Sequence, residues 1–309
     1  MILSPDTRAA PVMAPIIGEA FPDLATPRPR LLFTGEEFDT WAAGDVVMKF
    51  PRSEDDARKL AVEVAAHPVV ADRLGELVPK ILGVAEPSDR FPFLSVAYIR
   101  ARGRQGQTIE GPIIQPKAWA RTTLARELAQ ALTTLHTTPL KAVKAAGIAR
   151  HPVALDPQVD VGEDAIAWAR RVAGDAVDAF LSDPLPMEAR GAAAGVLCHA
   201  DLKGEHLFVS EDGTRLTAIV DWADAAIADP AADLAGLAIW LGPAFVREVL
   251  RSYDGPADEG TYHRAVFLAR AGLLGFLDGQ LAGTSEPAPV AMLDAQLRAV
   301  FREEAPARR

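Results

Sequence analysis

The sequence predicts an α+β fold with two lobes, a small β-rich N-terminal lobe and a larger, mostly helical C-terminal lobe. Strand-like apolar runs crowd the start of the chain, at 30–38, 45–51, 78–87 and 91–100. Helix-period patterns dominate the rest, and a polar, Gly-rich segment at 101–116 separates the two parts. We therefore expect lobes at 1–100 and 101–309, with a ligand site in a cleft between them.

The N-terminal lobe should contain two strand pairs and one long helix. Residues 1–29 hold several prolines and one short amphipathic piece, so we expect an extension with a short helix. Gly35 and Gly44 lie between the first two apolar runs and suggest a hairpin. A helical pattern then covers 54–77, with a break expected near Pro68 because proline lacks a backbone donor.

Amphipathic helices should build the C-terminal lobe. Leu124, Leu128, Leu132 and Leu135 recur at spacings of four, four and three, which is one face of a helix. Further helical patterns occur at 166–180, 232–242, 244–253, 261–283 and 290–304. His136 follows the leucine face, where we expect it to meet the last helix carbonyls. Asp229 and Asp233 should cap the next helix or brace a loop.

Composition limits the possible functions. Of the 309 residues 49% are hydrophobic and 24% charged, a profile typical of soluble globular proteins. The formal net charge of −10 argues against a nucleic-acid partner and suits a cationic small substrate, although solubility alone explains it equally well. Cys198 is the one cysteine, so disulfides and Cys-based zinc sites are excluded. No signal peptide or membrane partner is expected, which favours a cytoplasmic location.

Five polar residues crowd the centre of the chain, between two apolar runs. They are His199, Asp201, Lys203, Glu205 and His206. Two strand-like pieces follow, 207–209 and 216–220, and Asp212-Gly213 between them is a strong hairpin signal. Asp221 comes directly after the second piece. Because both ends of a hairpin return to the same place, we expect Asp201, His206 and Asp221 to come together.

These residue types suit phosphoryl transfer. Asp201 can accept a hydroxyl proton, and Asp221 with His206 can hold magnesium against phosphate oxygens. Lys203 can neutralise the transferring group. The order matches the protein-kinase template of a catalytic-loop Asp, a metal ligand and a second metal-binding Asp. The plainer alternative is a capped turn with a hydrogen-bonded His and a solvated Lys.

At these residues the chain resembles the aminoglycoside phosphotransferase family, antibiotic kinases related in fold to protein kinases. The stretches 198-CHADLKGEHLFV-209 and 219-IVDWADAAIADPAADLA-235 carry the resemblance. It implies a bilobal protein-kinase-like fold, Asp201 as catalytic base, and Mg²⁺ on His206 and Asp221. Most members have Asn where this chain has His206. Those acting on gentamicin-type aminoglycosides and the macrolide kinases are similar to this chain in having His.

The resemblance also implies nucleotide-binding residues in the first lobe. Lys49 lies in an apolar strand and should meet the nucleotide phosphates, paired with Glu63 of the following helix. An edge-strand Lys pointing to water is the alternative. Val96 and Tyr98 are candidates for the hinge that meets the purine, although core packing explains them equally well. The phosphate-covering loop would fall at 34–44, which lacks GxGxxG.

The expected function is transfer of the γ-phosphate of ATP or GTP, with Mg²⁺, to a hydroxyl of a cationic aminoglycoside, giving resistance by inactivation. Asp224 is a candidate contact for a substrate amine, against a solvated position. The acceptor can alternatively be a macrolide, a cyclic peptide antibiotic or a small metabolic alcohol or sugar. A non-catalytic nucleotide-binding module stays open, as does a metal-dependent hydrolase built on His199, Asp201 and His206.

Overall fold

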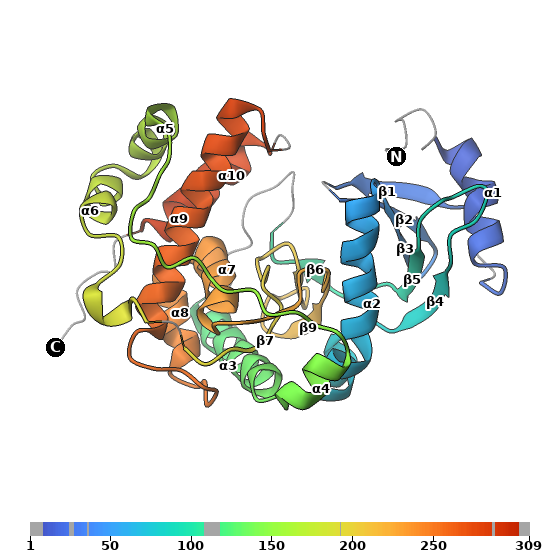
Figure 1. Ribbon diagram of the computed structural model, residues 1–309, viewed down its shortest axis with the longest axis horizontal. Coiled ribbons are helices and arrows are strands. Elements are labelled where there is room, and N and C mark those ends of the chain that lie inside the picture. The colour runs from blue at the N-terminus through green and yellow to red at the C-terminus, as the bar shows by residue number, and fades with distance from the viewer. Residues whose placement is uncertain are drawn as a thin grey trace. The chain divides into compact units, whose positions relative to one another are not determined.

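The computed structural model describes residues 9–24, 28–35, 37–107, 118–191, 193–285 and 288–302 (Figure 1). The chain forms two compact units. The first comprises Met1–Ala101 together with the short segment Val220–Asp224, and the second comprises Arg102–Ile219 and Ala225–Arg309. An antiparallel sheet builds the first unit and helices dominate the second, which confirms the predicted α+β class.

A five-stranded antiparallel sheet forms the first unit, in the order β1-β2-β3-β5-β4. Its strands are β1 (Arg30–Thr34), β2 (Phe38–Ala43), β3 (Val46–Pro51), β4 (Ile81–Ala85) and β5 (Ser95–Ile99). The strand β2 lies within the segment expected to be a phosphate-covering loop, so that expectation was wrong for 38–43. The strand was not predicted because Asp39 and Thr40 are polar and interrupt the apolar pattern. Both are nevertheless buried, in a sheet that is covered on both faces.

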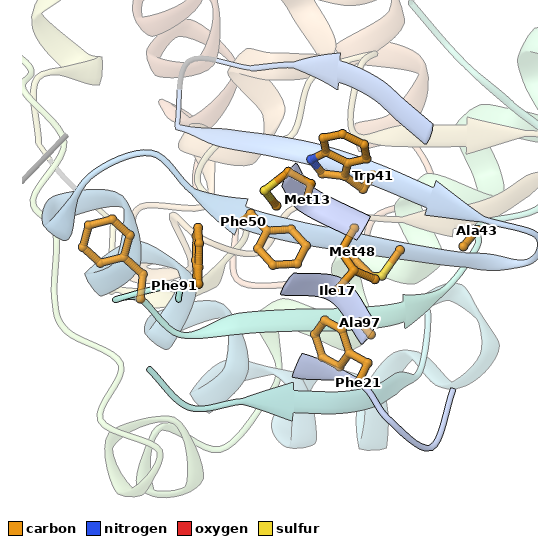
Figure 2. Close-up of a cluster of buried hydrophobic side chains, with 10 residues drawn as sticks. Met13, Ile17, Phe21, Trp41, Ala43, Met48, Phe50, Phe91 and Ala97 are labelled. Carbon is orange, nitrogen blue, oxygen red and sulfur yellow. The ribbon is translucent and has the colours of Figure 1, made fainter. Parts of the chain in front are cut away.

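Two helices cover opposite faces of this sheet. The helix α1 (Ala10–Ala20) contributes Met13 and Ile17 to an apolar cluster with Met48 and Phe50 of β3. Figure 2 shows these α1 side chains directed at the sheet residues. Because successive strand residues alternate faces, Lys49 must point to the opposite side. The predicted N-terminal helix is therefore present, and it completes the core of this unit.

The second covering helix is α2 (Glu54–Leu74), followed by the 3-10 turn η2 (Gly75–Leu77). Ser53 begins it as an N-cap, its hydroxyl accepting the Asp56 N–H at 3.2 Å. The expected break near Pro68 was wrong, because the helix continues through it. Pro68 lies on the exposed side of α2, where water can satisfy the carbonyl that loses its partner.

The second unit is mostly helical. Its helices are α3 (Ala118–His136), α4 (Leu140–Ala145), α5 (Glu163–Ala173), α6 (Ala176–Ser182), η3 (Met187–Ala189), α7 (Ala231–Leu241), α8 (Pro243–Leu250), α9 (Thr261–Ala282) and α10 (Val290–Val300). The apolar α7 lies at the centre and packs against α8, α9 and α10. In the described part of the chain, α9 alone is long and apolar enough to cross a bilayer. It packs against α5, α7 and α10 as a core helix would.

Two small sheets carry the central motif. The strand β7 (Val196–Cys198) pairs with β10 (Ala226–Ala228), and β6 (Arg104–Gln105) pairs with β8 (Leu207–Val209), which pairs with β9 (Leu216–Ile219). The predicted hairpin is confirmed, with Leu207 opposite Ile219. Gly213 occupies its turn at φ 70°, a conformation that other residues adopt only with strain.

Candidate active site

Lys49 lies between two carboxylates in the first unit. Its Nζ is 2.8 Å from Glu63 Oε2 and 2.8 Å from Asp221 Oδ1. The side chain of Lys49 is 12% exposed and that of Glu63 is 4% exposed, so a lysine pointing to water is excluded. The structure therefore brings together the strand Lys, the helix Glu and the Asp that follows the hairpin.

The surroundings of Lys49 keep it charged. Burial alone would lower its pKa, but the charges and hydrogen bonds of Asp221 and Glu63 outweigh burial and raise the pKa well above the ordinary value. The ammonium lies 5.1 Å from the centre of the Phe38 ring and 6.0 Å from that of Tyr98. Both rings add a favourable cation–π contact. Lys49 is thus a fixed positive charge at any physiological pH.

Asp221 is presented in an unusual backbone conformation. Among the described residues, Ala200 and Asp221 are the only non-glycine residues with positive φ, at 66° and 67°. Such strain costs on the order of 1–3 kcal/mol and concentrates at functional sites. Trp222 is buried, and Ala223 packs with Phe38 and neighbouring apolar residues of the first unit. These contacts stabilise the strained turn at Asp221.

Asp224 forms an ion pair within the first unit. Its Oδ1 lies 3.3 Å from Lys59 Nζ, and Lys59 also binds the Glu37 carboxylate. Burial alone would lower the pKa of Lys59, but these two carboxylates raise it. Asp224 is therefore already paired with a cation. A contact with a substrate amine stays a prediction, and this geometry does not favour it.

Val96 and Tyr98 lie inside β5, between β3 and β4. Val96 is the register partner of Lys49, and Tyr98 that of Val47. Both side chains are buried in the cluster on the α2 side of the sheet. Burial and the negative charges of Glu63 and Asp221 raise the pKa of Tyr98 well above its usual value. Core packing accounts for both residues, and a hinge role for them stays a prediction.

The second unit holds the polar loop that follows β7. Asp201 O accepts hydrogen bonds from Lys203 N at 3.0 Å and from His206 Nδ1 at 2.7 Å. Lys203 Nζ lies 3.3 Å from Asp201 Oδ2 and 3.6 Å from Glu205 Oε2. The ring of His206 stacks on that of His199 with centroids 5.7 Å apart. Asp201, Lys203 and His206 therefore form one compact group.

The donor set suits a divalent metal in part. A carbonyl oxygen can only accept, so His206 donates from Nδ1 to Asp201 O, and the lone pair of the neutral ring is on Nε2. Neutral imidazole with its second nitrogen held in this way is the form that ligates metals. Asp221 offers carboxylate oxygen, which magnesium prefers to nitrogen. Of the two residues, Asp221 offers the donor type that magnesium prefers, and magnesium binding by either residue stays a prediction.

A buried network holds this loop, and the sequence did not predict all of it. Asp233 accepts the backbone N–H groups of His199 at 3.1 Å and Ala200 at 2.8 Å. His136 Nε2 donates to the same carboxylate at 2.9 Å, and the Tyr253 hydroxyl donates to His136 Nδ1 at 2.7 Å. Asp233 braces the loop, one of the two roles expected for it. His136 does not meet helix carbonyls as expected, because α3 ends where it can reach Asp233.

Helix α7 approaches the loop closely. A Cβ on Gly236 would lie 2.0 Å from Leu202 O, so only glycine fits there. Trp240, one turn further along α7, packs against Gly204 and donates from Nε1 to Gly106 O at 2.9 Å. A glycine four residues before a buried Trp was the available signal for this contact. Helix α7 therefore fixes the position of this loop by close packing.

The predicted site residues form two groups, one in each unit. Lys49, Glu63 and Asp221 belong to the first, and Asp201, Lys203 and His206 to the second. The expected meeting of Asp201 and His206 with Asp221 joins residues of different units and stays a prediction. The first group combines a lysine with two carboxylates, and the second combines a lysine with one carboxylate and a histidine. Such residue types are suited to binding phosphate and exchanging a hydroxyl proton.

Comparisons with known proteins identify the family of the chain. Residues 32–267 match the model of the phosphotransferase enzyme family. Viomycin phosphotransferase of Streptomyces vinaceus is 27% identical over 206 residues, which are 62% of this chain and 65% of that protein, slightly less than two thirds of its length.

Solved structures show the fold. The GDP complex of wild-type aminoglycoside 2'-phosphotransferase-IIIa has a TM-score of 0.69 and 20% identity, covering 95% of this chain and 97% of the other. Macrolide 2'-phosphotransferase from Brachybacterium faecium has a TM-score of 0.63 and 24% identity, covering 95% and 99%. The predicted kinase-like fold is thereby confirmed. With most of its length matched, the chain belongs to the phosphotransferase enzyme family, as its central motif predicted.

Proposed function

We propose that this protein transfers the γ-phosphoryl group of ATP or GTP to a hydroxyl group of an antibiotic. A cationic aminoglycoside is the first candidate acceptor. Family membership and the names of the similar proteins, which act on viomycin, aminoglycosides and macrolides, support an antibiotic as substrate. The net charge of −10 favours a cationic acceptor among them.

One observation carries the proposal. The Lys49 ammonium is held 2.8 Å from Glu63 and 2.8 Å from Asp221, in a buried position that keeps it charged. A fixed cation beside a strained carboxylate is suited to a nucleotide phosphate and its divalent metal. A merely structural ion pair does not require the positive φ that Asp221 adopts.

Each polar residue then has a role. Asp201 orients the acceptor hydroxyl and takes its proton, and Lys203 lies beside it to balance charge on the phosphoryl group. Lys49 binds the nucleotide phosphates, and Glu63 fixes the position of Lys49. Asp221 and His206 would hold magnesium, which when bound neutralises the phosphate oxygens. Positioning and charge stabilisation should supply most of the rate enhancement.

The choice of nucleotide is open to experiment. Solved structures similar to this chain contain GDP, ADP or ATP. Both ATP and GTP are therefore candidates as phosphoryl donors, and neither is favoured by the side chains described around Lys49.

The test is a coupled assay with ATP or GTP and Mg²⁺ against kanamycin, viomycin and a macrolide. Release of nucleoside diphosphate should depend on the acceptor, and mass spectrometry should find phosphate on the antibiotic. We expect Asp201→Ala to lower turnover by roughly two to four orders of magnitude while the fold survives. Nucleotide binding without phosphate on any acceptor would reject the proposal and select the non-catalytic binding module instead.

A further inference from the structure

We propose that Glu205 is a positioning residue that holds the Lys203 ammonium beside Asp201 without letting it lock onto Asp201. This inference rests on the proposed function, because it assigns Asp201 and Lys203 to the reacting end of the site. It concerns a residue of the central polar cluster to which neither the sequence motif nor the expected metal ligands assigned a role.

Lys203 is shared between two carboxylates. Its Nζ lies 3.3 Å from Asp201 Oδ2 and 3.6 Å from Glu205 Oε2. The two carboxylates differ in environment, because the side chain of Asp201 is 36% exposed and that of Glu205 is 14% exposed. Charge interactions are screened less where water is excluded, so the more distant Glu205 can still compete for the lysine.

Glu205 depends on Lys203 in turn. Its Oε1 is buried, and no hydrogen-bond partner for that oxygen occurs among the described residues. Lys203 is the cation within ion-pair distance of Glu205 in the described chain. A buried carboxylate without compensation is costly, so this lysine strongly offsets the burial of Glu205.

The loop geometry keeps Glu205 in place. Its backbone oxygen accepts a hydrogen bond from Gln105 Nε2 at 3.0 Å, and the preceding Gly204 packs under Trp240. Gln107 N donates to Gly204 O at 3.0 Å. The β6 segment therefore anchors the backbone on which Glu205 lies, and the carboxylate has little freedom to follow Lys203.

Lys203 therefore has two carboxylate partners at once, Asp201 and Glu205. With Glu205 present, Lys203 can leave Asp201 for an incoming phosphoryl group while keeping one carboxylate partner. Without it, Lys203 would lose the competing carboxylate and pair more strongly with Asp201, and that pair would compete with the acceptor hydroxyl for the Asp201 oxygens. Glu205 then acts on the reaction only through Lys203.

A double-mutant cycle tests this dependence. Glu205→Gln is compared in the wild-type and Lys203→Met backgrounds, with the exposed Glu211→Gln as matched control, by measuring kcat and the nucleotide KM. We expect kcat to fall about fivefold in the wild-type background and less than about twofold in the Lys203→Met background, with KM unchanged. Equal losses in both backgrounds, or no loss in either, would overturn the proposal.

A second measurement does not need activity. Limited acetylation followed by peptide mass spectrometry compares the labelling rate of Lys203 with that of the exposed Lys144. Glu205→Gln should change the Lys203 rate severalfold and leave the Lys144 rate unchanged; an unchanged Lys203 rate would refute the contact. If the wild type transfers no phosphate to any acceptor, the proposed function fails, and labelling still decides whether Glu205 holds Lys203.

Discussion

Replacing Glu63 by Gln removes one of the two charges that hold Lys49, with almost no change in side-chain volume. The Glu63 carboxylate is buried and lies 2.8 Å from the lysine Nζ. Asp221 lies at the same distance and remains in the variant. We therefore expect Lys49 to stay charged but to move onto Asp221.

The magnitude follows from these distances. A unit pair at 2.8 Å attracts by about 6 kcal/mol at an effective dielectric constant near 20. The desolvation of two buried ions offsets several kcal/mol of that attraction. Because Asp221 still compensates the lysine, the loss of unfolding free energy should be about 1–3 kcal/mol, below that of an uncompensated buried charge.

The effect on function should be larger than this stability loss suggests. A lysine drawn onto Asp221 competes with magnesium for the same carboxylate. We expect the nucleotide KM to rise about tenfold and the magnesium requirement to shift to higher concentration. Steady-state kinetics at varied nucleotide and Mg²⁺, with urea unfolding, measure both. Glu76→Gln on the exposed turn after α2 is the control, and a normal nucleotide KM in Glu63→Gln would refute the role given to this pair.

Three further changes probe the fold and the loop. Ile17→Ala should lower the unfolding free energy by about 2–5 kcal/mol, since Ile17 is buried under the sheet, whereas Val12→Ala on the exposed side of α1 should have little effect in thermal melts. The pKa of the Cys198 thiol is raised chiefly by burial and also by the nearby Asp233 charge. At about pH 8, iodoacetamide should therefore not alkylate Cys198 in the folded protein, whereas it should alkylate Cys198 in the urea-unfolded chain. Asp233→Asn should cost about 1–3 kcal/mol and lower kcat, because it removes the charge that holds two loop N–H groups; wild-type kcat would contradict this.

The raised pKa of Lys49 also determines how its contribution to stability depends on pH. The pKa of Lys49 is higher in the folded protein than in the unfolded chain, so its charge stabilises the fold. This stabilisation is complete at a pH below the pKa of the unfolded chain, and it is lost as the pH rises through the pKa of the folded protein. Both values lie above the physiological range. Activity limits between about pH 6 and 9 must therefore come from other groups.

Local patterns in the sequence identified the central hairpin and the residues of the two polar groups. Asp212-Gly213 between apolar runs is a turn signal that depends on neighbouring residues alone, and the structure has the turn there. Lys49 was conspicuous because a charged residue in an apolar strand needs a partner. Glu63 was conspicuous on the apolar face of α2 for the same reason, and the two form a pair.

Contacts between distant elements were less visible. The strand β2 was missed because its buried Asp39 and Thr40 look like loop residues when the sheet neighbours are unknown. His136 was assigned to a helix end because its partners, Asp233 and Tyr253, lie 97 and 117 positions away. Lys59 drew no attention because α2 has many charged residues, and only the fold places it between Glu37 and Asp224.

The segment from Val220 to Asp224 has a structural role that the sequence motif alone did not predict. The hairpin before it and β10 after it belong to the second unit, yet these five residues belong to the first. Its buried apolar residues are Trp222 and Ala223. Such residues could pack in the core of either unit, so they do not show in the sequence which unit the segment joins. The charges on either side give the segment its orientation, Asp221 toward Lys49 and Asp224 toward Lys59. Within the first unit the segment therefore contributes two ion pairs, and the pair with Lys59 accounts for a second acidic residue so soon after Asp221.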